Sequence, residues 1–424
     1  MSKLPISGLK WVELSEIEEI DWSQIDTEGE YGYILEVDMT YPKFLHRAHS
    51  NFPLAPQNVE ISFENLSKYS KRSLQDVSKS SKFADVKLVS TFHPREEYVL
   101  HFKNLKLYLQ LGMKLKKIRR VLMFRQSNFI APYIEKCTEF RQKSKTKFEQ
   151  DQFKKLANCI YGKTIQNVRG YMNVKIHMKN SSLQKSLNNP FFKNFTIISE
   201  NLVQTNEDRD CVVHDRPLFV GFTILELSKH FMFDFFYNKL STSSSFNIDL
   251  GMSDTDSFLF KVDNAQAFRE HVKKFMDYSN YPPNHPNFSN KNKSKLGYFK
   301  DELAGKQKCL EFVGLKSKCY SMLLQKTGSG EVGEKKICKG LGRAAIKNRV
   351  KFEHYKQCLF EKKTRRYDFH SISSKKHSIS TIRINKQALT HFDSKRFIYS
   401  CGIHSEPYGS VLIEKFGNKC PKCF

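Results

Sequence analysis

The sequence predicts an α+β fold in which a small antiparallel sheet presents a hairpin, with helical segments before and after it. Two observations lead to this prediction: an acidic turn flanked by strand-like segments at residues 247–260, and helical periodicity on both sides of that turn. With 39% hydrophobic and 13% aromatic residues, the composition excludes a disordered chain. The 424 residues suffice for two or three domains, each with its own core.

The expected elements follow from local patterns. Alternation of apolar residues predicts strands, apolar residues three and four apart predict helices, and clusters of Asn, Ser, Asp and Pro predict loops. In the first part of the chain we expect a strand at 33–38, a Ser/Lys-rich surface excursion at 61–100, a helix at 104–115 built on Leu105, Tyr108, Leu109 and Met113, and a strand at 118–124. In the middle we expect two helices with a basic face at 127–169, an Asn/Ser/Asp-rich loop or small insertion at 180–215, and an aromatic helix at 222–240 that leads into the acidic hairpin. After the hairpin we expect irregular chain at 276–295, a strand at 308–323, and a basic, mainly helical segment from 336 onward.

The charge of the chain predicts a polyanionic partner. Seventy basic residues against 44 acidic ones give a formal net charge of +26, and they are spread over the whole length. We favour nucleic acid as the partner over the alternative of a merely lysine-rich solvated surface. No apolar run approaches the ~20 residues of a membrane-spanning helix, so no membrane is expected as a partner. Ten cysteines, scattered singly apart from Cys420 and Cys423, indicate a reduced, intracellular protein.

The acidic turn is the first candidate for chemistry. Asp254 and Asp256 stand two residues apart between strand-like segments, and on one extended strand they would share a face, with Thr255 on the other. Two carboxylates on one face repel each other, so we expect a cation between them, and oxygen-only ligation of this kind suits Mg²⁺. The alternative is an ordinary acidic surface turn.

A basic helix supplies the second candidate. Helical spacing places Lys154, Asn158 and Tyr161 on one face. A cation, an amide and an aromatic ring in a row suit a triphosphate and its base. Taken alone, an amphipathic helix with a solvated lysine edge explains the pattern equally well.

The third candidate is a Lys-x-Lys-x-Tyr segment. Alternation on one strand would place Lys316, Lys318 and Tyr320 on the same face, where two cations beside an aromatic ring suit a nucleic-acid backbone. An exposed edge strand protected by lysines would look the same.

In this order the three segments closely resemble the C-terminal polymerase region of family B DNA polymerases. More narrowly, they resemble the protein-primed branch found in Maverick/Polinton-type transposons, related viruses and linear plasmids. Lys154, Asn158, Tyr161 and Gly162 match the motif B pattern Lys-x-x-x-Asn-Ser-x-Tyr-Gly, with Cys159 in place of Ser. Further matches are Asp254–Asp256 to motif C (with Met252 where an aromatic is usual), Lys318–Tyr320 to the Lys-x-Tyr motif, and weaker similarity at 32–38, 53–56, 339–340 and 402–403.

The resemblance implies nucleotidyl transfer with two Mg²⁺ ions, on a primer–template DNA and with deoxynucleoside triphosphates. Asp256 would be the principal metal ligand and Asp254 would support it. The nucleotide would contact Lys154, Asn158, Tyr161 and Gly162; primer–template DNA would contact Lys316, Lys318, Tyr320 and Lys339. A terminal protein as primer follows from the subfamily alone. The implied parts are a partial palm with an inserted surface region at 1–125, fingers helices at 126–175, an insertion or loop at 176–215, palm at 216–325, and thumb with C-terminal segment at 326–424.

One part of the family pattern has no match. Motif A carries the other catalytic aspartate in the pattern Asp-x-x-(Ser/Asn)-Leu-Tyr, and the spacing from Asp38 to Tyr41 is too short for it. We therefore expect the chain to start just past motif A, to lack the 3′–5′ exonuclease domain, and to polymerise poorly or not at all. The alternatives are a catalytically inactive relic that binds DNA and an unrelated basic nucleic-acid-binding protein.

Two further patterns lie outside the resemblance. The spacing of Cys401-x-x-His404 and Cys420-x-x-Cys423 is one that zinc can use, but from the sequence we favour two unrelated thiol pairs. The basic cluster Lys362–Arg366 has the composition of a nuclear localisation signal, although such clusters also arise by chance in so basic a chain.

Overall fold

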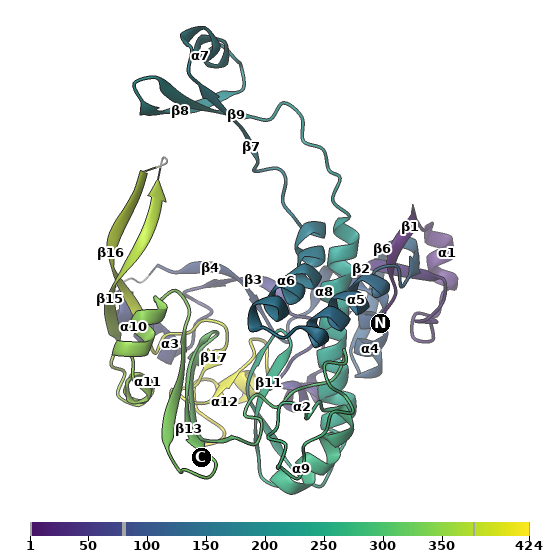
Figure 1. Ribbon diagram of the computed structural model, residues 1–424. Helices are drawn as coiled ribbons and strands as arrows, with labels where there is room; N and C mark the ends of the chain where they lie inside the picture. Colours follow the sequence, from purple (N-terminus) through teal and green to yellow (C-terminus); the bar gives the residue numbers. More distant parts are fainter. Residues whose placement is uncertain (1, 79–81, 376–377, 424) are drawn as a thin grey trace.

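The computed structural model describes residues 2–78, 82–375 and 378–423, and it is a mixed helix and strand structure with antiparallel sheets (Figure 1). The N-terminal sheet has the strand order β1-β6-β2-β5. Alternation decides which side of β2 is buried: Leu35, Val37 and Met39 face the core and the residues between them are more exposed. The elements of this part are β1 (Leu4–Trp11), α1 (Leu14–Glu19), β2 (Tyr31–Thr40), β5 (Arg95–His101), α4 (Phe102–Gln110) and β6 (Lys114–Ser127).

Three helices pack beside this sheet. They are α5 (Ala131–Lys143), α6 (Lys147–Thr164) and α8 (Leu218–Asp234), which continues as the π-helix η2 (Phe235–Leu240). A capping box between Thr146 and Glu149 starts α6, and Phe140 packs on Phe153 at 5.2 Å between ring centroids. A side chain at Gly221 would collide with Thr164, so glycine allows α8 to pass close to the end of α6. The helices predicted at 104–115, 127–169 and 222–240 are confirmed, with the first ending at Gln110.

Residues 172–208 form a separate small lobe that stands away from the body on two extended connections (Figure 1). It contains β7 (Met172–His177), α7 (Asn180–Leu187), β8 (Phe192–Ser199) and β9 (Leu202–Asp208), in the sheet order β7-β9-β8. The buried His177 joins the lobe by hydrogen bonds to Ser182 and Thr205. Residues 180–215, predicted to be a loop or small insertion, therefore contain regular structure as far as Asp208; we call the lobe 172–208 the insertion.

The acidic hairpin consists of β10 (Ile248–Asp254) and β11 (Ser257–Val262), which form a two-stranded sheet of their own. Phe258 and Phe260 of β11 pack against the core residues Phe235 and Leu240 of η2. The helices α9 (Ala265–Val272) and η3 (Lys273–Phe275) follow, and the chain from 276 to 306 is irregular apart from one isolated bridge, as predicted.

The structure from residue 336 onward differs from the prediction of a mainly helical segment. Two long strands dominate it: β15 (Arg365–Lys375) pairs with β16 (Ser378–Leu389). The apolar residues Tyr367 and Phe369 stand two positions apart on β15, and this spacing of two is typical of a strand. It determines a strand here although the segment is basic. The elements that precede β15 in this part of the chain are β12 (Gln307–Lys316), β13 (Cys319–Lys326), β14 (Val332–Cys338), α10 (Arg343–Arg349) and α11 (Phe352–Phe360).

A second correction concerns residues 61–100, predicted to be a surface excursion. Instead β3 (Gln57–Ser62), α3 (Lys68–Ser78) and β4 (Ala84–Val89) share a hydrophobic core with the C-terminal segment, including Leu74, Tyr399 and Cys420. Apolar residues that stand between the serines and lysines of this segment form the buried face of these elements. The remaining elements are η1 (Lys43–Leu45), α2 (His46–His49), β17 (Phe397–Ile398), β18 (Ser405–Glu406) and α12 (Val411–Phe416).

None of the helices in the described part of the chain is long and apolar enough to cross a bilayer.

Candidate nucleic-acid interface

The predicted strand, tight turn and strand around the two aspartates are confirmed. Strand β10 ends at Asp254, which pairs with Ser257 across a two-residue turn. Thr255 has φ of 57°, the left-handed conformation that such turns require. The turn is closed by the N–H of Asp256, which donates to the carbonyl oxygen of Asp254 at 2.6 Å, and by the Ser257 hydroxyl, which donates to the same oxygen at 3.1 Å.

The turn changes the expected relation between the two carboxylates. Asp254 belongs to the strand and is half-buried, whereas Asp256 lies in the turn and is exposed, so they do not alternate along one extended strand. A lysine side chain pairs with the first carboxylate: Nζ of Lys318 lies 3.3 Å from Oδ1 of Asp254. Two of the sequence motifs, separated along the chain, therefore meet directly.

The Lys-x-Lys-x-Tyr segment is a hairpin and not a single strand, which corrects the prediction that its three side chains share one strand face. Lys316 ends β12, Cys319 begins β13, and these two residues pair across the turn. Lys318 occupies the turn with φ of 56°. Tyr320 follows on β13, 5.9 Å from the ring of Phe312, and burial together with the nearby charge of Asp254 raises its pKa.

Further lysines gather around this hairpin. The N–H of Lys339 donates to the carbonyl oxygen of Lys318 at 3.0 Å, which places the predicted Lys339 beside the turn. Lys316 reaches Oγ1 of Thr390 at 3.4 Å. Lys386 was missed by the sequence reasoning: a side chain at Gly340 would collide with its ammonium group, so it lies against the chain next to Lys339. It belongs to no motif, and only the folding of β16 brings it here.

The motif B residues lie on α6, as predicted. Lys154, Asn158 and Gly162 are exposed on this helix and Tyr161 is half-buried. No hydrogen bond or ion pair engages the Lys154 ammonium within the described residues, so it is available to an anion. Asn158 and Tyr161 line a cavity of ≈ 330 Å³ between α5, α6, α8 and β1, whose other walls include Ile134, Ile224 and Leu227.

Helix α8 connects the two parts of the candidate site. It packs on α6 and on β1, and its continuation η2 places Phe236 5.9 Å from Phe258 of the acidic hairpin, between ring centroids. Among the described residues, no hydrogen bond or ion pair joins the α6 motif directly to Asp254 or Asp256.

A metal at the acidic turn would depend on few protein ligands. In the described ranges, no third His, Cys, Asp or Glu completes a metal-binding group with Asp254 and Asp256. Asp38 is held elsewhere: it accepts hydrogen bonds from Nε of Arg119 at 2.8 Å and from the N–H of Glu97 at 2.9 Å, and the Arg119 hydrogen bond lowers its pKa.

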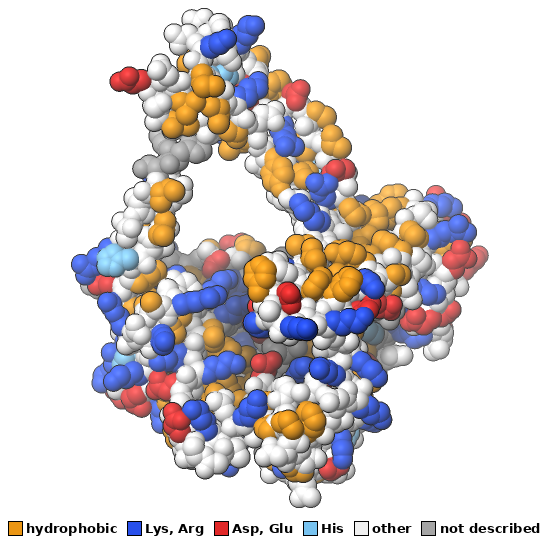
Figure 2. Space-filling model, viewed as in Figure 1, with side chains coloured by type: hydrophobic (Ala, Val, Ile, Leu, Met, Phe, Trp, Pro, Cys, Tyr) orange, Lys and Arg blue, Asp and Glu red, His pale blue; other side chains and the backbone are white. Residues whose placement is uncertain are grey.

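Figure 2 shows Lys and Arg side chains over much of the face that this view presents. This charge gives a polyanionic chain a surface to follow.

No protein-family model matches this sequence, and no curated protein matches it. Among solved structures, the orthorhombic crystal form of Phi29 DNA polymerase is similar to this chain at a TM-score of 0.50 and 13% sequence identity, over 90% of this chain and 55% of that one. Complexes of Phi29 DNA polymerase also match, each over 91% of this chain and 64% of the other. The post-translocation binary complex with primer–template DNA has a TM-score of 0.41 at 13% identity, and the ternary complex with incoming nucleotides has 0.44 at 14%. The chain spans about half the length of the first of these structures, and its fold is similar to that of a DNA polymerase.

Proposed function

We propose that this chain is the polymerase region of a DNA-templated DNA polymerase of family B, protein-primed branch. One observation carries the proposal: Lys318 of the Lys-x-Tyr hairpin lies 3.3 Å from Asp254 of the acidic turn. Two of the three motifs that resemble those of one family, in the order of that family, therefore also meet in space within a polymerase-like fold. An accidental resemblance gives no reason for such a contact.

In this proposal the β10–β11 hairpin and the N-terminal sheet form the palm, α5 and α6 the fingers, and the segment from 326 the thumb with its C-terminal extension. Asp254 and Asp256 offer carboxylate oxygens at an open turn, a donor set that fits Mg²⁺ in kind. Bound there, Mg²⁺ would supply activation of the primer oxygen and neutralisation of charge on the triphosphate. Two carboxylates hold such ions only loosely, because two Mg²⁺ ions need several anionic oxygens.

The cationic groups have separable roles. Lys154, which has no ion-pair partner among the described residues, would bind the triphosphate, and Asn158, Tyr161 and Gly162 would form the surface beside the nascent base pair. Lys318 neutralises Asp254 in this structure, and if Asp254 held a divalent ion, the Lys318 ammonium would be available to a primer phosphate. Lys316, Lys339 and Tyr320 would line the same primer–template track. Protein priming by a terminal protein rests on the resemblance alone.

Primer extension tests the proposal. Residues 1–424 are compared with a chain carrying an upstream segment that supplies motif A, on a primed DNA template with and without Mg²⁺. We expect Mg²⁺-dependent incorporation by the longer chain and little by residues 1–424. Robust extension by residues 1–424 would refute the need for a third carboxylate. If neither chain extends the primer, although the longer chain is folded and binds DNA, the polymerase proposal is refuted.

A second candidate is a catalytically inactive relic that binds DNA. The neutralisation of Asp254 by Lys318, with no third acid beside them in the described residues, favours this alternative. It predicts binding of primer–template that weakens steeply with salt, without incorporation of nucleotides by either chain.

A further inference from the structure

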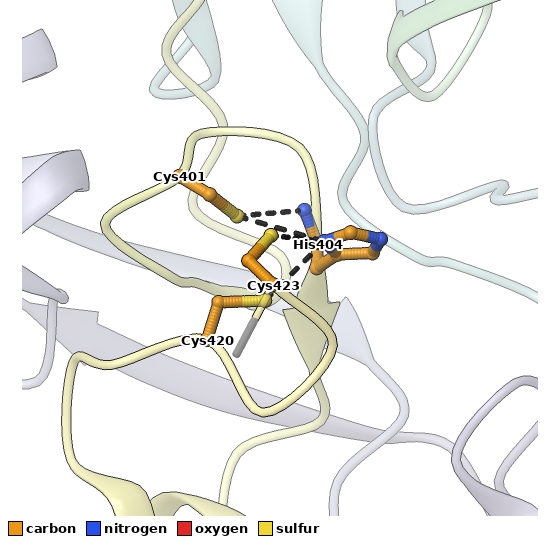
Figure 3. Close-up of side chains that lie close together, drawn as sticks. All are labelled: Cys401, His404, Cys420 and Cys423. Atoms are coloured by element: carbon orange, nitrogen blue, oxygen red, sulfur yellow. Dashed lines mark hydrogen bonds between the residues drawn. The ribbon is translucent and has the colours of Figure 1, made fainter.

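The two Cys/His pairs near the C-terminus come together in the fold, which corrects the interpretation that they are unrelated. Cys401 and His404 lie on the turn between β17 and β18, and Cys420 and Cys423 lie in the segment after α12 (Figure 3). Their four ligand atoms all lie within 4.8 Å of one another.

The distances are those of a tetrahedral metal site. Nδ1 of His404 lies 3.7 Å from Sγ of Cys401, 3.3 Å from Sγ of Cys420 and 3.4 Å from Sγ of Cys423. A tetrahedron with Zn–S bonds of about 2.3 Å and a Zn–N bond of about 2.0 Å has S···N edges of about 3.5 Å. One imidazole nitrogen has a single lone pair or a single proton, so hydrogen bonding cannot explain three sulfur neighbours at once.

Backbone contacts hold both pairs in position. The N–H of His404 donates to Sγ of Cys401 at 3.4 Å, and the N–H of Cys423 donates to the carbonyl oxygen of Cys420 at 3.3 Å. Ser400 donates its N–H to the carbonyl oxygen of Asn418 at 3.0 Å, which joins the two ligand-bearing segments beside the site. The ligand positions are therefore fixed by the fold and not by the sulfur atoms alone.

We propose that Cys401, His404, Cys420 and Cys423 bind one structural zinc ion. Three thiolates and one imidazole in tetrahedral arrangement favour Zn²⁺, and four protein ligands leave no open coordination position for catalysis. Cys420 is 2% exposed and belongs to the same core as Leu74 and Tyr399, so the ion would hold the two ligand-bearing parts of the C-terminal segment together beside the core that this segment shares with β3, α3 and β4. This inference does not depend on the proposed polymerase function.

Metal content of the purified full chain tests the proposal directly. The protein is prepared under reducing conditions in zinc-supplemented medium, and zinc and iron are measured by elemental analysis. We expect one zinc ion per chain. Replacement of zinc by Co²⁺ should produce thiolate-to-cobalt charge transfer and the visible bands of tetrahedral Co²⁺. The Cys423→Ser and Cys401→Ser variants should bind Co²⁺ at least about 100-fold more weakly.

Three variants make the result specific. Cys211→Ser changes an exposed cysteine outside the cluster and should retain zinc fully. His404→Cys keeps four ligands and should retain the metal, with the cobalt spectrum shifted toward four thiolates, whereas His404→Ala should lose it. Folded wild-type protein that contains no zinc and takes up no Co²⁺ would overturn the proposal. So would stoichiometric iron in place of zinc, or a disulfide within the cluster under reducing conditions. If a serine variant fails to fold, the cobalt titration of the wild-type protein and the metal content of His404→Cys still test whether the cluster binds zinc.

Discussion

At the scale of the residue, Asp256 is the exposed acid of the turn and Asp254 is already paired with Lys318. We predict that Asp256→Asn lowers Mg²⁺-dependent incorporation by about 100-fold or more in the chain that carries motif A, since a metal ligand contributes several kcal/mol to the transition state. The same variant should bind primer–template at least as tightly, because a negative charge is removed. Single-turnover extension and fluorescence anisotropy measure the two effects. Asp249→Asn, on the same hairpin away from the turn, is the control, and equal losses in both variants would contradict the assignment.

Lys318 provides a separate test of DNA contact. We predict that Lys318→Ala weakens primer–template binding and lowers the slope of log K against log salt by about 0.9, the contribution of one phosphate contact. Lys326→Ala is the matched control, because Lys326 lies at the other end of β13, the strand that follows the Lys318 turn, and pairs with Glu331 at 2.6 Å. An unchanged slope for Lys318→Ala would remove this residue from the proposed interface.

At the scale of the element, our proposal assigns the nucleotide contacts to helix α6 and the primer–template contacts to other elements. We predict that Lys154→Ala raises the KM for deoxynucleoside triphosphates about tenfold in the active, longer chain while leaving the affinity for primer–template nearly unchanged. Lys155→Ala, which also removes an exposed lysine but from another face of the helix, should change neither. A similar rise of KM in both variants would point to general charge and not to a specific site.

We expect the body of the protein to fold without the insertion. Met172 pairs with Asp208, so the ends of the lobe are adjacent and a short Gly/Ser linker can replace residues 172–208. We predict that this deletion changes the Tm of the remaining protein by less than about 2 °C, because the lobe stands apart from the body. Trimming the β15–β16 hairpin back to Arg365 and Leu389 should lower the Tm more, since it removes Tyr367 and Ala388 from a core. Calorimetry compares the two deletions, and the reverse order of their effects would contradict the argument.

At the scale of the whole molecule, buried neutral histidines should make stability depend on pH. Burial lowers the pKa of His49 from 6.5 to about 4 and that of His101 to about 3. Below pH 6.5 the unfolded chain therefore binds protons that the folded chain does not. The free energy of unfolding should fall as the pH drops toward these values, by about 1.4 kcal/mol per pH unit for each histidine.

Denaturant unfolding between pH 7 and pH 4.5 measures this slope. Tyr41 accepts the N–H of Leu54, and its hydroxyl lies 2.6 Å from Nδ1 of His49. The His49→Asn variant places an amide oxygen near the position of Nδ1, so the contact with Tyr41 can persist while the titration is lost. Its slope should be smaller than that of the wild type by about 1.4 kcal/mol per pH unit. Identical slopes for the wild type and the His49→Asn variant would show that His49 has the same pKa in the folded and unfolded chains.

The sequence by itself determined the local chemistry of this protein: the strand–turn–strand around Asp254, the helix that carries Lys154, and the net positive charge. These features depend on neighbours in the chain, so periodicity and turn residues suffice to predict them. Prediction from the sequence failed for β15 and β16, where a basic composition concealed the alternation of apolar residues. It also failed for Lys318, which lies in a turn and does not continue a strand.

Only the tertiary structure decided which distant residues meet. The pairing of Lys318 with Asp254, the place of Lys386 beside the Lys339 segment and the cluster of Cys401, His404, Cys420 and Cys423 all join residues from separate elements. Spacing along the chain fixes the distance between near neighbours only. Contacts between separate elements are set by which apolar faces pack together, and that packing minimises the free energy of the whole chain and not of any one segment.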